Sequence, residues 1–132
     1  MQTKKLRFKK IKKGKLKKYE YRSNFLKFGT IGLKAINSGF ITSKQIESAK
    51  QAITKKIHRK GKVWVTVFPD QPITAKPTEV RMGKGKGAFS HWAAKVKGGS
   101  VIFEICGVNI KVAIKAFKTG GAKLPIKTSI FL

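Results

Sequence analysis

The chain has 132 residues and carries 31 lysines and arginines against 5 acidic residues, a formal net charge of +26. Self-repulsion at this charge density opposes collapse unless a polyanion neutralises it, so the composition indicates a nucleic acid as partner. The sequence has no apolar run of about 18 residues and no lipidation signal, so we expect no membrane partner.

The length predicts one domain, and a hydrophobic content of 41% is enough for a modest core. We expect a basic N-terminal tail over residues 1–22 and a single domain over residues 23–132. The single cysteine, Cys106, excludes an intrachain disulfide and a multi-cysteine zinc site, which fits a reducing compartment.

The tail is dense in lysine and has few apolar residues. A solvated arm and an import sequence are the alternatives to RNA binding. Import sequences are typically rich in Arg and Ser, whereas Lys dominates here and no serine precedes Ser23. We therefore expect the tail to be embedded in RNA, through Lys4, Lys5, Arg7, Lys9, Lys10, Lys12, Lys13, Lys15, Lys17 and Lys18.

The folded part is expected to begin with one strand over about residues 25–36, bent at Gly29 and Gly32. A helix over about residues 43–58 follows, because Thr42 and Gln45 form a capping-box pattern. Its apolar residues recur every three or four positions, which predicts one buried face.

Residues 62–68 alternate β-branched and aromatic residues, which predicts a second strand. Pro72 and Pro77 then argue against a regular helix, and we expect a long loop from Gln71 to Gly87.

The C-terminal third is predicted to contain a hairpin, a helix and a short strand. The hairpin spans residues 92–97 and 100–106 and turns at Gly98 and Gly99. The helix runs over about residues 109–118 with Asn109 as N-cap, and the last strand covers residues 126–132. These elements predict an α+β fold, a two-layer sandwich in which a mainly antiparallel sheet carries both helices.

The long loop ends in the sharpest local motif, in which glycine alternates with lysine. This alternation lets backbone N–H groups approach an anion while each lysine supplies a charge, as RNA phosphates require. A merely flexible loop is the alternative. The spacing of a nucleotide-hydrolysing P-loop is absent, and no strand leads directly into the motif as in a dinucleotide fold. The RNA-binding candidates here are Arg81, Met82, Gly83, Lys84, Gly85, Lys86 and Gly87.

No catalytic or metal site is evident. His58 and His91 are far apart in sequence and have no Cys or acid at metal-ligand spacing, and the acidic residues are dispersed. We expect a protein that is not an enzyme and needs no cofactor. A DNA-compacting protein or a small phosphate-handling enzyme remains an alternative.

Several segments resemble the ribosomal protein sixteen family of the large subunit, over about residues 28–128. The matching motifs are Phe28-Gly29, Gly32-Leu33-Lys34-Ala35, Thr42 with Gln45-Ile46-Glu47, Gly61 to Val65, Phe68 to Thr74, Lys76-Pro77, Arg81 to Gly87 and Lys123 to Thr128.

The resemblance implies an α+β protein that binds large-subunit rRNA near the peptidyl-transferase centre and the aminoacyl-tRNA site. Its implied partners are rRNA, tRNA in that site and neighbouring large-subunit proteins, and no homo-oligomer is implied. The tail and the glycine–lysine loop would reach this region, and the first helix would offer basic residues to RNA. The candidates on and after that helix are Lys50, Lys55 and Arg59.

Some positions depart from the family pattern. Gln51 stands where bacterial relatives commonly carry a basic residue, and Ile105-Cys106 replaces the usual Met-Asp. Lysine far outnumbers arginine, and isoleucine is frequent, as in an A+T-rich coding genome. We therefore expect an organellar ribosome, in the mitochondrial matrix first, with the plastid stroma or the cytoplasm of a low-G+C bacterium as alternatives.

Overall fold

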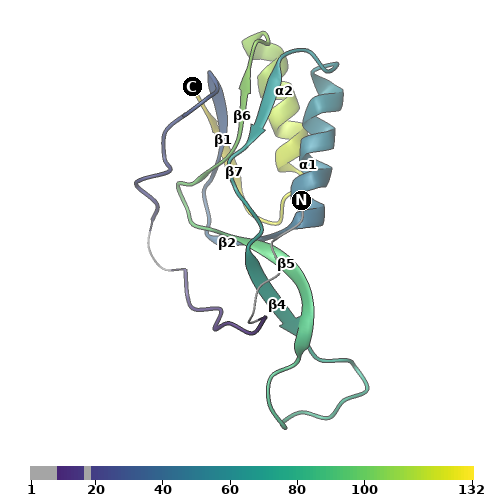
Figure 1. The fold of residues 1–132 in the computed structure, drawn as a ribbon. Coiled ribbons are helices and arrows are strands. Elements are labelled where there is room, and N and C mark those ends of the chain that lie inside the picture. Colours follow the sequence, from purple (N-terminus) through teal and green to yellow (C-terminus); the bar gives the residue numbers. More distant parts are fainter. Residues whose placement is uncertain (1–8, 17–18) are drawn as a thin grey trace.

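The computed structural model describes residues 9–16 and 19–132 (Figure 1). It contains two antiparallel sheets and two helices, α1 and α2, and the helices cover one face of the larger sheet. The larger sheet has the strand order β3-β6-β1-β7, and the smaller has the order β2-β5-β4. The elements are β1 Ile31–Ala35, β2 Gly39–Thr42, α1 Ser43–Lys56, β3 Lys62–Val65, β4 Gln71–Ala75, β5 Ala88–Val96, β6 Val101–Cys106, α2 Ile110–Gly121 and β7 Thr128–Phe131.

The predicted α+β class is confirmed, but the antiparallel strands are divided between two sheets instead of forming one. The smaller sheet projects from one end of the larger and carries the long loop at its tip (Figure 1). We call β4, β5 and the loop over residues 76–87 the arm.

The core lies between the helices and the inner face of the larger sheet. Phe103 of β6 and Phe117 of α2 are fully buried there, as are Ala49 and Ile53 of α1. The two helices approach closely at Gly120, where a Cβ would lie only 2.5 Å from Cγ1 of Ile53. Burial of this apolar area is the main force that holds the domain together.

The capping box that the sequence predicts at the start of α1 is confirmed. Thr42 Oγ1 accepts a hydrogen bond from Gln45 N at 3.3 Å, and Gln45 Oε1 accepts one from Thr42 N at 2.9 Å. The helix ends at Lys56, two residues earlier than predicted, because His58 and Arg59 adopt left-handed φ angles of 53° and 60°.

The predicted N-cap of α2 is also confirmed, since Asn109 Oδ1 accepts a hydrogen bond from Lys111 N at 3.0 Å. This helix continues through Gly121, beyond its predicted end at residue 118. The two glycines near its C-terminus do not stop it, because Gly120 is buried against α1.

The predicted strand over residues 25–36 is wrong in its first half. Only Ile31–Ala35 forms a strand, while residues 24–30 cross the outer face of the larger sheet. Glu104 takes the N–H groups that a strand would have paired: its Oε2 accepts hydrogen bonds from Phe28 N and Gly29 N, both at 2.7 Å. Leu26 then packs over Gly32, where a Cβ would lie 2.6 Å from Cδ2 of Leu26.

The predicted hairpin between residues 92 and 106 is also wrong. A turn does form, with Ser100 N donating to the carbonyl oxygen of Lys97 at 3.1 Å. The strands on either side nevertheless belong to different sheets, because β5 pairs with β2 and β4 while β6 pairs with β1 and β3. Of the two glycines, only Gly99 has a positive φ, of 92°. The turn therefore connects the two sheets.

The predicted loop from Gln71 to Gly87 is shorter than expected, because its first residues form β4. Pro72 lies in this strand, opposite Trp92. A proline, which has no N–H group to donate, is tolerated there because β4 is an edge strand. Strands β3 and β7 are shorter than the predicted ranges 62–68 and 126–132. Within the described part of the chain, no helix is long and apolar enough to cross a membrane.

Candidate nucleic-acid interface

The loop at the tip of the arm has an unusual backbone. Three consecutive residues have positive φ angles: Gly83 at 94°, Lys84 at 51° and Gly85 at 88°. Apart from the adjoining residues, no atom lies within 4 Å of the place where a Cβ on Gly83 or Gly85 would stand. Glycine is therefore favoured at both positions by the backbone conformation and not by a lack of space. Lys76 donates a hydrogen bond to the carbonyl oxygen of Gly83 across the loop. The glycines therefore set the path of the chain at this tip.

The base of the loop is narrow. A Cβ on Gly87 would lie 2.5 Å from the carbonyl oxygen of Ala75, so the two strands of the arm approach too closely for any larger residue. Beyond this point the side chains from Arg81 to Lys86 are exposed, and Met82 is 98% exposed. The segment from Arg81 to Lys86 thus presents three cationic side chains, one of them a planar guanidinium suited to bidentate phosphate recognition.

The structure brings the N-terminal tail to this loop, although they are 75 residues apart in sequence. Lys86 Nζ donates to the carbonyl oxygen of Ile11, and Lys10 Nζ donates to that of Lys86 at 3.3 Å. The ammonium of Lys9 lies 5.7 Å from the ring centroid of Phe89, at the start of β5. Residues 9–11 of the tail and the loop therefore form one cationic surface along the arm.

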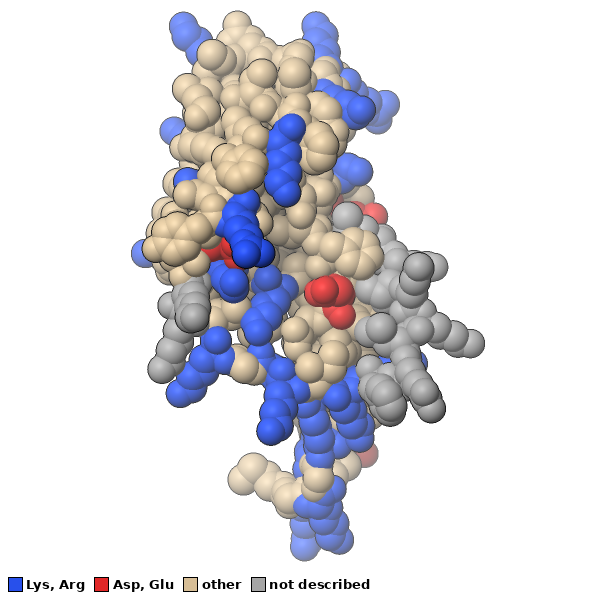
Figure 2. Space-filling view, turned by 60° about the vertical axis from the view of Figure 1, so that its left-hand side comes forward, with Lys and Arg blue, Asp and Glu red and all other residues tan. Residues whose placement is uncertain are grey.

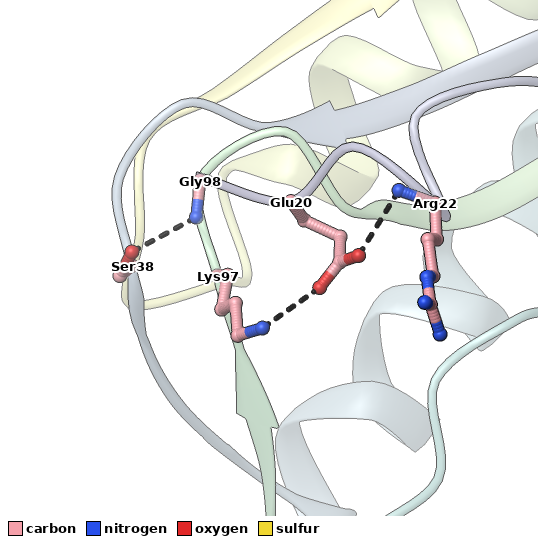
Figure 3. Close-up of polar contacts among 5 residues, drawn as sticks. All are labelled: Glu20, Arg22, Ser38, Lys97 and Gly98. Carbon is pink, nitrogen blue, oxygen red and sulfur yellow. Dashed lines mark hydrogen bonds and ion pairs between the residues drawn. The ribbon is translucent and has the colours of Figure 1, made fainter. Parts of the chain in front are cut away.

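The C-terminal end of the tail, at Glu20, is held at the turn between the two sheets (Figure 3). Glu20 N donates to the carbonyl oxygen of Gly98 at 2.8 Å, and the Glu20 carboxylate pairs with Lys97 Nζ at 3.0 Å. The same carboxylate accepts a hydrogen bond from Arg22 N. The hydrogen bond from Lys97, followed by that from Arg22, lowers the pKa of Glu20 below its ordinary value of 4.5. This contact fixes where the tail leaves the domain.

The described lysines predicted in the tail are all exposed, namely Lys9, Lys10, Lys12, Lys13 and Lys15. The other predicted tail residues lie outside the described residues, namely Lys4, Lys5, Arg7, Lys17 and Lys18.

A second cationic region lies on the C-terminal half of α1. The predicted residues Lys50, Lys55 and Arg59 line one open groove of about 820 Å³. The left-handed turn at His58 and Arg59 places both residues along this groove. The helix C-terminus carries partial negative charge, which Lys55 and Lys56 in its last turn complement.

The predicted binding residues that the structure describes thus form two groups. The end of α1 lies at the opposite end of the molecule from the loop of the arm (Figure 1). Seen from the side shown in Figure 2, Lys and Arg side chains are most crowded toward the end that carries the arm. An extended polyanion can meet both groups, whereas a small ligand cannot.

Some residues of these surfaces were missed from the sequence. Lys76 was not predicted as a site residue, yet it holds the loop through Gly83. Thr54 and His58 line the α1 groove, and the four-residue spacing from Lys50 to Thr54 and on to His58 could have suggested it. Lys97 could not have been found, because its partner Glu20 is far away in sequence.

No metal cluster emerges from the described residues. Within residues 9–16 and 19–132, no three His, Cys, Asp or Glu side chains gather in a way that could hold a metal ion.

Comparison with known proteins identifies the family of the chain. Residues 3–131 match the model of the family described as ribosomal protein L16p/L10e. The chain is 51% identical to the large ribosomal subunit protein uL16 of Parvibaculum lavamentivorans over 97% of this chain and 92% of that protein. It is 52% identical to the same protein of Bartonella quintana, over 97% and 93% of the two chains. For Christiangramia forsetii the identity is 47%, over 97% and 92%. The chain therefore belongs to the ribosomal protein L16p/L10e family.

Proposed function

We propose that this chain is a structural constituent of the large ribosomal subunit that binds rRNA and helps to organise the aminoacyl-tRNA site near the peptidyl-transferase centre. The observation that carries the proposal is the joining of tail and arm, in which Lys86 and Lys10 each donate to a carbonyl oxygen of the other segment. The result is a long cationic projection beyond the core. Such a projection can insert between RNA helices, because the RNA phosphates neutralise its positive charge.

The roles of the surfaces follow from their chemistry. The lysines of the tail over residues 1–22 would contact phosphates without reading sequence. The loop from Arg81 to Gly87 would bind RNA through its backbone shape and guanidinium, and it is the segment that would approach the aminoacyl-tRNA. The α1 groove, with Lys50, Lys55 and Arg59, would contact a separate stretch of rRNA. Neighbouring ribosomal proteins would be its protein partners, with a single copy of this chain in each subunit.

We further propose that the ribosome is mitochondrial. The support is the excess of lysine over arginine and the frequent isoleucine, which fit an A+T-rich organelle genome. The relatives named above are bacterial proteins, so a bacterial cytoplasm is the competing location, and the plastid stroma is a second. Co-sedimentation of the chain with ribosomes from purified mitochondria tests this location. Recovery only with plastid or cytoplasmic ribosomes would contradict it.

The ribosomal role itself is tested by directed cleavage of RNA. The test variant carries Met82→Cys together with Cys106→Ser, so that it has a single cysteine. An iron chelate attached to this cysteine generates hydroxyl radicals. Large subunits containing this variant should show cleavage of rRNA near the peptidyl-transferase centre and of tRNA in the aminoacyl site. The matched control places the cysteine at Lys115, an exposed residue of α2. Cleavage of rRNA but never of tRNA from position 82 would disprove the tRNA contact and leave the rRNA contact standing.

A further inference from the structure

One further groove lies outside the cationic surfaces described above. Its volume is about 530 Å³, and Phe25, Phe28 and Phe68 all contribute to its lining. These three residues are 58%, 61% and 51% exposed. A group of exposed aromatic rings around one groove indicates an interaction surface.

The ring of Phe28 is held in a defined position. It stacks on Trp64 of β3 with a centroid separation of 6.1 Å and an interplanar angle of 20°. Its backbone is fixed as well, because Phe28 N donates to the buried carboxylate of Glu104. Lys62 Nζ lies 5.2 Å from the centroid of the Trp64 ring. The surface is therefore preorganised, which lowers the entropy lost on binding.

The charges around the groove are compatible with a polyanion. Glu104 is 1% exposed, and its carboxylate is satisfied by backbone N–H groups. The Glu20 carboxylate is paired with Lys97. The lining also contains Lys27, Lys95 and the exposed Asp70. Of the charged residues in this lining, only Lys27, Lys95 and Asp70 are therefore exposed.

We propose that an unpaired rRNA base stacks on Phe28 in this groove, while Lys27 and Lys95 contact the neighbouring phosphates. This inference rests on the proposed binding of rRNA and adds a third contact surface to it. Exposed aromatic rings flanked by lysines suit an unpaired base, because stacking and phosphate contacts then act together. A fully paired helix could not use the Phe28 ring, so the site selects a loop or bulge.

The test compares the affinity of full-length variants for large-subunit rRNA at several salt concentrations. Phe28→Leu keeps an apolar side chain but removes the ring, and we expect binding to weaken by about 5- to 100-fold. The slope of log affinity against log salt should stay unchanged, because no charge is lost. Phe28→Tyr keeps the ring and should bind within about twofold of the unchanged protein. Ile110→Ala removes an apolar residue that is similarly exposed, on α2, and should also have little effect.

The outcomes separate the two proposals. If the unchanged protein fails to bind rRNA, the proposed function itself is wrong. If it binds and Phe28→Leu binds equally well, only the stacking site is wrong. If Phe28→Leu binds rRNA normally but is lost from assembled subunits, the groove takes a protein segment and the RNA assignment is overturned.

Photocrosslinking by ultraviolet light gives a second measurement that does not depend on the variants. Stacked rings and bases form adducts at zero distance, so we expect adducts on Phe25, Phe28 or Phe68 in complexes of the unchanged protein with rRNA. Adducts confined to the arm and the tail would overturn the proposal.

Discussion

The carboxylate of Glu104 and the backbone of Gly29 are joined by a hydrogen bond of 2.7 Å, although the two residues are 75 positions apart in sequence. A Cβ on Gly29 would lie 2.8 Å from Cβ of Glu104 and 2.9 Å from the backbone of Ile105. The glycine therefore allows the contact, and the contact holds residues 27–29 across the larger sheet.

Replacement of Glu104 should destabilise the protein. Glu104→Ala leaves the N–H groups of Lys27, Phe28 and Gly29 without their acceptor, and we expect a loss of about 3 kcal/mol in the free energy of unfolding. Glu104→Gln keeps one acceptor oxygen and should lose less. Urea denaturation measures the free energy of unfolding of both variants. Glu47→Gln, at an exposed position, is the control and should change this free energy by no more than about 0.5 kcal/mol. Equal stability of the Ala variant would show that Glu104 does not anchor the segment.

Gly120→Ala should also destabilise the protein, against the usual trend in helices. Alanine normally stabilises a helix relative to glycine, by about 0.5 to 1 kcal/mol. Here the added Cβ would meet Ile53 Cγ1 at 2.5 Å, and we expect a net loss of about 1 to 3 kcal/mol from overpacking. Ser48→Ala, at an exposed position of α1, should be neutral or slightly stabilising. A gain in melting temperature for Gly120→Ala would contradict the close approach of α1 and α2.

Removal of the tail should reduce the number of phosphate contacts. Log affinity for rRNA falls with log salt by roughly 0.7 to 0.9 per contact, so the slope counts them. Deletion of residues 1–18 removes the predicted phosphate-binding residues of the tail, and the slope should become clearly shallower. Binding measured between low and moderate salt checks this. A slope equal to that of the full chain would mean that the tail does not touch RNA.

The loop should depend on its shape as well as its charge. Arg81→Lys keeps the charge but loses the planar fork, and Gly85→Val forces a β-branched residue to a φ of 88°. Both variants should enter large subunits but reduce translation by about tenfold, equivalent to about 1.4 kcal/mol. Translation by purified subunits at matched occupancy is the measurement.

Lys115→Ala is the control for the loop variants, because this residue is an exposed lysine of α2 away from the arm. It should be nearly silent. If Arg81→Lys and Gly85→Val were equally silent, the loop would be a generic basic patch.

The contact of Glu20 with Lys97 should make stability depend on pH in a defined direction. The hydrogen bond from Lys97 lowers the pKa of Glu20 in the folded protein, so its contribution is fully present above the ordinary value of 4.5. The contribution is lost as the pH falls through the lowered value. Glu20→Gln should therefore be less stable than the unchanged protein at pH 7, with a smaller gap near pH 3. A gap that is the same at both pH values would assign the effect to packing.

Local patterns in the sequence were sufficient for features that depend on neighbouring residues. The capping box at Thr42 and Gln45 and the N-cap at Asn109 were predicted correctly, because these hydrogen bonds join residues two or three positions apart. The glycine–lysine loop was identified for the same reason. Net charge alone indicated a polyanionic partner, and the motifs identified the family.

Only the tertiary structure decided how distant segments pair. The turn at Gly98 and Gly99 looks like a hairpin in sequence, but the strands that flank it join different sheets, since each finds its partners elsewhere in the chain. Glu104 looks like a surface acid in sequence but is buried under residues 27–29. The meeting of Lys86 with the tail and the groove around Phe28 likewise depend on contacts between residues far apart in the chain, which no local pattern records.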